Sequence, residues 1–263
     1  MLRKYQKVLG IGLKLLLAAF IMVSCVPQRK IKYFQSAEGQ AKLAIFEAPG
    51  GEGYRVNKGD NLYIKVQSID EKTYKFFNAE GSQNYASQAY NEAGMYLTSY
   101  AVSDSGTIEF PFVGTVFVEG LTLEEIKTRI QKVVSQYLLE TTVIVKLVNF
   151  KITILGEVKN PGHYVIYQDK INIFEAIGRA NDLTVFGNKN AVILVRQSEK
   201  GSEIHEIDLT KRDILASEFF YLQPNDIIYI EPLRGKQFAF ADFPYALIFS
   251  SITTTLLILS YFK

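Results

Sequence analysis

Residues 54–66 read YRVNKGDNLYIKV, and this stretch decides the fold expected for the first half of the chain. Leu62, Ile64 and Val66 alternate with polar or charged neighbours, which is the period of a half-buried β-strand. Gly59 precedes the strand, and because glycine lacks a Cβ we expect a turn with a positive φ angle there. The stretch therefore predicts a tight turn that leads into a strand covering one side of a core.

A second stretch, residues 220–230, repeats this pattern with the sequence FYLQPNDIIYI. Aromatic, amide, turn, aspartate and Tyr-Ile positions coincide in the two stretches. Asn225 replaces Gly59, and asparagine is the residue that next best tolerates the left-handed conformation. Because any strand–turn–strand segment would show part of this likeness, we interpret it as shared turn chemistry and not as a duplication.

The sequence after the first stretch predicts a compact mixture of strands and one helix. Asp104-Ser105-Gly106-Thr107 is typical of a hairpin turn, followed by strands over residues 108–112 and 116–118. Thr122-Leu123-Glu124-Glu125 predicts a helix start, because the hydroxyl and a carboxylate can cap free N–H groups. Residues 142–148 predict a β-branched strand. The helix positions expected to face the core are Leu123, Ile126, Ile130, Val133, Val134, Tyr137 and Leu138.

A second region of the same kind follows. Residues 152–155 predict a strand that leads through Gly156-Glu157-Val158 to Asn160-Pro161-Gly162, where we expect a type II turn with a positive φ at Gly162. Asn172 predicts the cap of a short helix. Further strands are expected over residues 191–195 and 203–209, and the inward-facing helix residues are Ile173, Phe174 and Ile177.

Residues 70–100 are rich in Asn, Ser, Gln, Ala and Tyr and fit either a long loop or a short inserted helix. Their tyrosines could stack on sugars, or they could pack against their own domain.

The N-terminus predicts export from the cytoplasm. Residues 1–24 begin with basic side chains and no acid, continue with the apolar run 15–23, and fit a secretory signal peptide. The apolar run is shorter than the roughly 20 residues of a membrane-spanning helix. Met22-Val23-Ser24-Cys25 resembles a bacterial lipobox, which implies a diacylated thiol at Cys25 and stable anchoring through its acyl chains. The alternative is a buried structural cysteine beside an ordinary signal peptide or membrane anchor.

The C-terminus holds a second apolar segment. Residues 243–262 carry no charge, and a helix of that length is about 30 Å long, which matches one hydrocarbon core. Hydroxyls in its middle suit a side that faces other helices or water, and the alternative is a plain single-span anchor. These hydroxyl residues are Ser250, Ser251, Thr253, Thr254 and Thr255.

Composition excludes several classes of function. The chain has 263 residues, a formal charge of +2, one cysteine and two histidines. The lone cysteine excludes internal disulfides and cysteine-rich metal sites, and the balanced charge argues against a nucleic-acid partner. His163 and His205 are expected to be ordinary exposed residues, and Glu124 and Glu125 point about 100° apart on a helix, which does not suit a glycosidase pair. We therefore expect no enzyme activity, no cofactor and no metal.

The motifs together resemble the polysaccharide export outer-membrane family (Wza-type translocons). Residues 54–66, with Gly59 and Asp60, are similar to its opening pattern, and Asp104, Gly106, Pro111 and Gly114 are similar to its second. The second region resembles the β-grasp domain called SLBB through Gly156, Pro161 and Gly162. Residues 180–182 and Asn225 depart from glycines of the family, and only one β-grasp repeat fits, where larger members carry two.

The resemblance implies an α+β protein: two small periplasmic α+β modules, an export domain and then a β-grasp-like SLBB domain, with a C-terminal transmembrane helix. It implies an outer-membrane channel subunit that exports capsular or exopolysaccharide as a ring-shaped homo-oligomer, with an octamer as the candidate assembly. The implied partners are an inner-membrane polysaccharide copolymerase with its tyrosine kinase, the polysaccharide cargo and outer-membrane lipid. The alternative is a lipid-anchored periplasmic glycan-binding or scaffold protein. The expected segments are a signal peptide (1–24), a lipidated tether (25–51), the export domain (52–149), the SLBB-like domain (150–233) and the outer-membrane helix (234–263).

Overall fold

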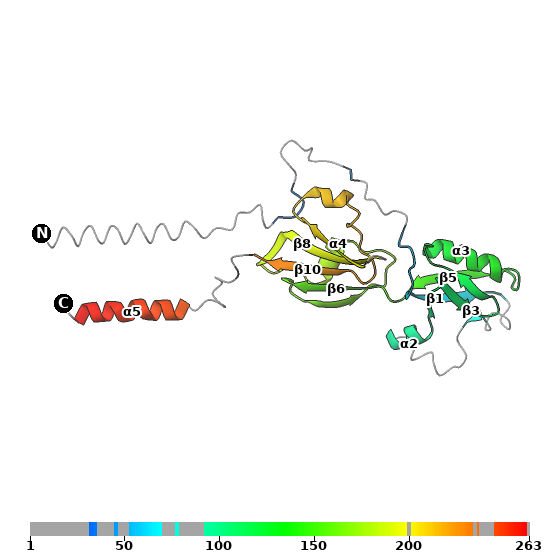
Figure 1. Ribbon diagram of the computed structural model, residues 1–263, viewed down its shortest axis with the longest axis horizontal. Helices are drawn as coiled ribbons and strands as arrows, with labels where there is room; N and C mark the ends of the chain where they lie inside the picture. The colour runs from blue at the N-terminus through cyan, green and yellow to red at the C-terminus, as the bar shows by residue number, and fades with distance from the viewer. Residues whose placement is uncertain are drawn as a thin grey trace.

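The computed structural model describes residues 32–35, 45–46, 53–69, 77–78, 92–198, 201–233, 236 and 245–261. The signal peptide and Cys25 lie outside the described residues. Figure 1 shows two modules arranged along the long axis of the molecule, with helix α5 (Tyr245–Tyr261) set apart from both. Each module has its own buried cluster of apolar side chains, and Leu147 packs against both clusters.

The first module is built on a three-stranded antiparallel sheet with the order β2-β1-β5. Strand β1 (Asn61–Gln67) lies in the centre, between β2 (Tyr100–Ala101) and β5 (Thr142–Leu147). The burial of β1 alternates along the strand, with Leu62 and Val66 fully buried, as the period-two pattern predicts. The predicted strand is therefore confirmed and lies at the centre of the sheet.

A hairpin and two helices complete the first module. The hairpin consists of β3 (Thr107–Phe110) and β4 (Gly114–Phe117), and the short helix α2 (Glu92–Leu97) precedes β2. Helix α3 (Leu123–Val134) packs against β5. The hairpin shortens the predicted strand 108–112, because the chain turns after Phe110. Of the region 70–100, the described part thus includes one short helix, which is one of the two alternatives expected.

The predicted capping box of α3 is confirmed. The Thr122 hydroxyl accepts the Glu125 N–H at 3.2 Å, and the Glu125 carboxylate accepts the Thr122 N–H at 2.7 Å. Ile126, Ile130 and Val134 are buried and Leu138 follows them into the core. The prediction for Tyr137 is wrong: its ring is 56% exposed. The helix ends at Val134, so the helical spacing no longer applies to this residue.

The second module is a five-stranded mixed sheet with the order β7-β6-β10-β8-β9. The last strand in sequence is central: it pairs parallel with β6 and antiparallel with β8, and the other pairs are antiparallel. The strands are β6 (Lys151–Gly156), β7 (Gly162–Val165), β8 (Gly187–Ser198), β9 (Gly201–Ile207) and β10 (Ile227–Pro232).

Helix α4 (Ile173–Arg179) contributes its inner side to the core of this sheet, and the 3-10 helix η3 (Arg212–Ala216) adds Ile214. The Asn172 side chain accepts the N–H groups of Phe174 and Glu175, so the predicted cap is confirmed. Ile173 and Ile177 are buried as expected, and Phe174 is only partly buried. One face of the sheet is thereby covered.

The prediction of a positive φ at Gly162 is wrong. Positive φ angles occur instead at Asn181 (60°) and Asp182 (71°), at the end of α4, whereas Gly162 is the first, extended residue of β7. The N–H groups of Lys159 and Asn160 donate to the carbonyls of Asp182 and Ala180. The connection between β6 and β7 is therefore an open segment held by the end of α4, and it does not need a closed type II turn.

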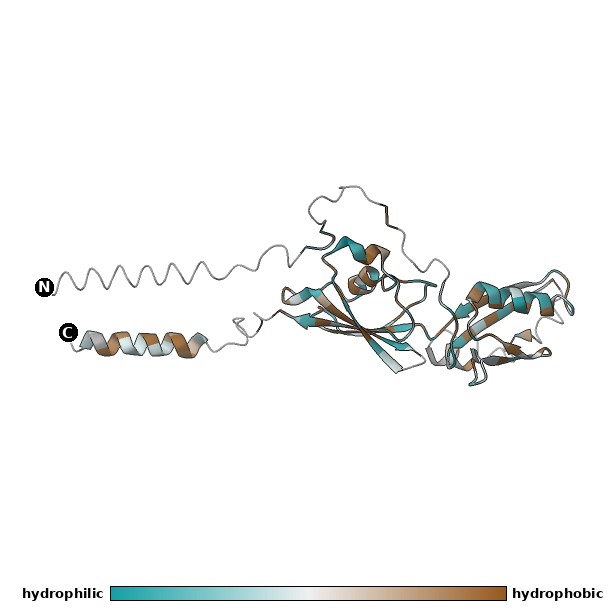
Figure 2. Cartoon of the chain, turned by 45° about the horizontal axis from the view of Figure 1, so that its top comes forward, coloured by the Kyte–Doolittle hydropathy of each residue, from teal (hydrophilic) through white to brown (hydrophobic). Residues whose placement is uncertain are grey.

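Two features concern the ends of the chain. Residues 32–35, within the segment expected to be a tether, lie against the second module: the Tyr33 hydroxyl donates to Asp182 at 2.6 Å, and the Phe34 and Phe174 ring centroids are 4.4 Å apart. In Figure 2, α5 is coloured brown to white along most of its length. Within the described part of the chain, no helix has both the length and the hydropathy that a membrane crossing requires.

Candidate functional site

The two related turns of the sequence lie at the junction between the modules, and both adopt the expected conformation. Gly59 has a φ of 82° and Asn225 a φ of 66°, so the left-handed conformation is confirmed at both positions. In each turn the aspartate that follows is buried, with 4% of Asp60 and 0% of Asp226 exposed. A buried carboxylate must be hydrogen-bonded or paired with a cation, and the two turns do this differently.

Asp60 is satisfied by neutral donors. The N–H of Asn57 and the hydroxyl of Tyr54 both donate to Oδ2 of Asp60 at 2.8 Å, and Asn149 Nδ2 approaches Oδ1 at 3.4 Å. Burial raises the pKa of Asp60, and these hydrogen bonds offset only part of that increase. Burial also raises the pKa of the Tyr54 hydroxyl, with further contributions from the charges of Asp60 and Asp226. Tyr54 is therefore a direct hydrogen-bond partner of the Asp60 carboxylate.

Asp226 is satisfied by a cation. Arg196 donates from Nε to Oδ1 at 3.0 Å and from Nη2 to Oδ2 at 2.7 Å, and the Gln223 N–H donates to Oδ2 at 2.7 Å. The side chains of Arg196 and Asp226 are 12% and 1% exposed. This geometry is a bidentate, largely buried ion pair.

The two turns hold opposite ends of the chain segment that joins the modules. On the first side, the Val148 N–H donates to the Asn61 carbonyl at 3.0 Å, and the Asn61 N–H donates to Asn149 Oδ1 at 3.2 Å. On the second side, the Asn225 N–H donates to the Lys151 carbonyl at 2.7 Å, and the Thr153 N–H donates to the Asp226 carbonyl at 2.9 Å. Residues 148–153 are thus bound at both ends, and the turns fix how the modules meet.

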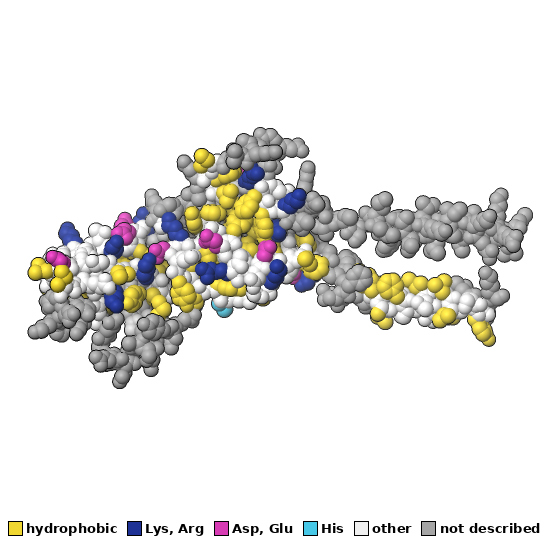
Figure 3. All heavy atoms as spheres, turned by 180° about the vertical axis from the view of Figure 1, so that it is seen from behind, with side chains coloured by type: hydrophobic (Ala, Val, Ile, Leu, Met, Phe, Trp, Pro, Cys, Tyr) yellow, Lys and Arg dark blue, Asp and Glu magenta, His cyan; other side chains and the backbone are white. Residues whose placement is uncertain are grey.

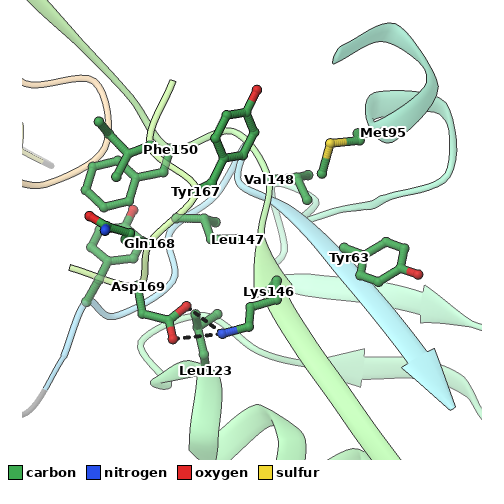
Figure 4. Close-up of a pocket in the computed structure, with 12 residues that line it drawn as sticks. Tyr63, Met95, Leu123, Lys146, Leu147, Val148, Phe150, Tyr167, Gln168 and Asp169 are labelled. Atoms are coloured by element: carbon green, nitrogen blue, oxygen red, sulfur yellow. Dashed lines mark hydrogen bonds and ion pairs between the residues drawn. The ribbon is translucent and has the colours of Figure 1, made fainter. Parts of the chain in front are cut away.

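A groove of about 240 Å³ lies at this junction (Figure 4). Lys146 and Asp169 come from different modules and form an ion pair at 2.8 Å along one side of it. The rest of the lining is largely apolar and aromatic, with Tyr54, Tyr63, Met95, Leu147, Phe150 and Tyr167 among its members. Within the described ranges, no three His, Cys, Asp or Glu side chains gather as a metal ion would need. The groove could accommodate an apolar or ring-shaped group, and its ion pair could bind hydroxyls.

The second motif of the sequence lies partly beside this site. The Val102 N–H donates to the Asp60 carbonyl at 2.8 Å, and the Gly59 N–H donates to the Val102 carbonyl at 2.9 Å. Asp104 and Gly106 follow in the next turn, where Gly106 has a φ of 75° and its position leaves no room for a Cβ beside Glu119.

The remaining motif residues lie away from the junction. Pro111 and Gly114 are in the turn at the other end of β3, and Gly114 has a φ of 79°. Gly156 is the last residue of β6, whereas the junction lies at the other end of this strand, which begins at Lys151. Pro161 is exposed in the connection between β6 and β7. The structure therefore separates these residues from the two turns.

Sequence reasoning missed three residues of the junction: Arg196, Tyr54 as a carboxylate partner, and Asn149. Arg196 follows the apolar run 191–195 without interruption, and a charge continuing a buried strand is a signal that a buried counter-ion exists. His205 is also placed differently from the prediction: it is half-buried and stacks on Phe219 at 4.2 Å between ring centroids.

The five predicted hydroxyl residues of α5 all bond within their own helix. Each of their hydroxyl groups donates to a backbone carbonyl three or four residues earlier, at 2.8–3.0 Å. Such bonds satisfy the hydroxyls of Ser and Thr without a partner helix. Their presence alone therefore does not require a neighbouring helix.

Two domain families match the modules just described. Residues 48–148 match the family of polysaccharide biosynthesis/export proteins, and residues 150–230 match the SLBB domain. Together, in this order along the chain, the two matches support a polysaccharide export family protein.

Two polysaccharide export outer membrane proteins from Ralstonia species are similar to this chain. The EPS I polysaccharide export outer membrane protein EpsA of Ralstonia solanacearum is 29% identical over 192 residues, which cover 70% of this chain and 49% of that protein. The protein of the same name from Ralstonia nicotianae is 27% identical over 147 residues, covering 54% of this chain and 38% of the relative. The chain thus spans about half or less of the length of these relatives.

Proposed function

We propose that this protein is an outer-membrane subunit of a polysaccharide export channel, built from several copies of the chain. The two domain matches support a role in polysaccharide export, and the names of the relatives from Ralstonia support the outer membrane as its place. Its family is one of export proteins and not of enzymes. In this proposal the cargo is a capsular or exopolysaccharide, and an inner-membrane copolymerase with its tyrosine kinase delivers it.

The observation that carries the proposal is that both predicted membrane attachments lead from the same module. Residues 32–35 pack on the second module, seven residues after the predicted lipid site at Cys25, and so within about 25 Å of it along the chain. Residue 236, which leads to α5, also lies on this module. A lipid at one end and α5 at the other would therefore hold the second module at the membrane, with the export domain pointing away.

Assembly of several copies is supported by an apolar face of the second sheet. Tyr229 lies between Leu155 on β6 and Ile193 on β8, and Ile227 lies beside Val195. Val195 in turn pairs with Ile204 on β9. Leu155, Tyr229 and Ile204 are 43%, 39% and 70% exposed, although a sheet face that is open to solvent is normally polar. We infer that another copy of the chain covers this face in the assembly.

In the assembly, one α5 from each copy would line up as a ring of helices across the membrane. Figure 3 shows a row of hydrophobic side chains along one side of α5 and mostly other side chains along the opposite side. Such a helix can present different sides to lipid and to a pore.

A second function is favoured by one observation. Because the five α5 hydroxyls are satisfied by their own backbone, a single α5 could also serve as a simple anchor. The protein would then be a lipid-anchored periplasmic scaffold, or a glycan-binding protein that uses the groove at the junction.

The size of the detergent-extracted protein distinguishes the two functions. The channel requires a stable ring of many subunits, and a monomer would exclude it.

Ile204→Glu should break the assembly, because it places a charge on the apolar face. Val185→Glu, which adds the same charge at a residue that is 81% exposed and lies outside the sheet, is the matched control. A cysteine placed at Lys263 should be labelled from outside intact cells, and a well-expressed variant that stays unlabelled would contradict the channel.

A further inference from the structure

The three residues Gly156-Glu157-Val158 at the end of β6 have separate structural tasks. Gly156 has a φ of 86°, and a Cβ there would lie 2.1 Å from the Ile230 carbonyl oxygen, so no side chain fits. Val158 is 4% exposed and belongs to the hydrophobic core. Glu157 is also almost buried, at 9% exposure, and neither backbone geometry nor apolar packing accounts for a carboxylate there.

Glu157 connects three parts of the second module. Its N–H donates to the Ile230 carbonyl at 3.0 Å, and its own carbonyl accepts the Thr184 N–H at 2.9 Å. The Thr184 hydroxyl donates to Oε2 of Glu157 at 2.6 Å, and Lys236 Nζ lies 2.5 Å from Oε1. The carboxylate thus joins β6, the connection between α4 and β8, and the chain beyond β10.

Lys236 lies where the chain leaves the module for α5. It comes four residues after the end of β10 and nine residues before α5 begins. The Leu233 N–H donates to the Phe186 carbonyl at 2.7 Å, and the Lys236 N–H donates to the Leu233 carbonyl at 2.9 Å. The backbone therefore turns back onto the module directly after β10, and Glu157 binds the last described side chain of this turn.

The geometry points to a new role for Glu157: it is the positioning residue that fixes the place from which the chain leaves the second module toward α5, with Lys236 as its partner. The bond from Lys236, followed by that from Thr184, lowers the pKa of Glu157, which is therefore ionised at neutral pH. The Glu157 side chain of this ion pair is 11% exposed and that of Lys236 is 42% exposed, so the pair contributes little net stability, but it specifies one partner and one position. In the proposed channel, which this role assumes, the pair sets where each α5 starts relative to its module.

The test is a charge exchange in the full-length protein, extracted in detergent. The variants are Glu157→Lys, Lys236→Glu and the double exchange, and Glu218→Lys is the control with the same charge change on an exposed part of the module. The readout is the initial rate of chymotrypsin cleavage after Phe238 and Phe240, which follow Lys236 in the sequence. Each single exchange should raise this rate about tenfold, the loss expected from one charge-assisted bond, and the double exchange should restore it.

Glu157→Gln separates a positioning role from a purely structural one. The amide still accepts the Thr184 hydroxyl but lacks the charge for Lys236, so cleavage after Lys236 should rise while cleavage inside the module stays unchanged. Equal cleavage in all variants, no restoration in the double exchange, or cleavage that rises throughout the module would overturn the role of Glu157.

Surface polysaccharide is measured in the same strains. Loss in the single exchanges and recovery in the double exchange supports the positioning role within the channel. The two proposals can fail separately. If deletion of the protein leaves surface polysaccharide intact, the proposed function is refuted, whereas the expected cleavage pattern still supports the positioning role.

Discussion

Asp60 and Asp226 occupy equivalent turns, and the same substitution at each should have very different consequences. Asp226→Asn removes the charge that pairs with Arg196, whose side chain is only 12% exposed. Breaking a buried ion pair by removing one partner costs about 3–5 kcal/mol, because the remaining charge stays buried. Asp60→Asn loses no ion pair and keeps an acceptor for the Asn57 N–H and the Tyr54 hydroxyl. Its cost should be about 1 kcal/mol or less.

The difference can be measured by denaturant unfolding of the detergent-solubilised protein. Because the chain has no tryptophan, far-UV circular dichroism or tyrosine fluorescence is the suitable signal. Asp226→Asn should lower the free energy of unfolding of the second module by at least about 2 kcal/mol more than Asp60→Asn lowers that of the first. Adding Arg196→Met to Asp226→Asn should recover part of the loss. Equal costs at the two positions would refute the reasoning, since the hydrogen bonds of the turn, and not the ion pair, would then dominate.

Three further outcomes are expected. Gly156→Ala should destabilise the second module by more than about 2 kcal/mol in the same unfolding measurement, since the added Cβ would collide with the Ile230 carbonyl. Gly162→Ala is the control and should be nearly neutral, because a Cβ at Gly162 would have no atom within 4 Å. A large effect of Gly162→Ala would contradict the geometry. As the pH falls from 7 toward 4, wild-type protein should gain stability relative to Asp60→Asn. The raised pKa of Asp60 means that the folded protein takes up the proton at a higher pH than the unfolded chain does, which favours the folded state. An unchanged difference in stability across this range would show that Asp60 titrates normally. Cys25→Ser should abolish incorporation of a radiolabelled fatty acid and release the protein from its normal membrane fraction, whereas retained label would place the lipid elsewhere.

Much of the fold could be predicted because it depends on local chemistry. The capping box at Thr122, the cap at Asn172 and the left-handed residues Gly59 and Asn225 each involve contacts within a few positions of the chain. The alternating pattern of β1 likewise reports burial directly. These features are visible in a single sequence because the residue type and the conformation are coupled locally.

The junction could not be predicted in the same way, because its contacts join distant residues. Arg196 and Asp226 lie 30 positions apart, and Asn149 and Asp60 lie 89 apart. The failed prediction at Gly162 has the same cause: the segment before β7 is held by carbonyls at the end of α4, so a Pro-Gly pair that would form a turn in isolation is used differently. Glycine and proline indicate where the chain can bend, but the neighbouring elements decide how.

The central place of β10 in the second sheet has a consequence for how the protein is made. The strand is the last of the module in sequence, yet it lies between β6 and β8 and contributes Ile228 and Ile230 to the core, both fully buried. During synthesis, β6 and β8 therefore cannot be joined until residue 232 is available, and pairs of such long sequence separation form slowly. Until then both strands have a free edge, so the nascent module would depend on protection from aggregation until its final strand is inserted.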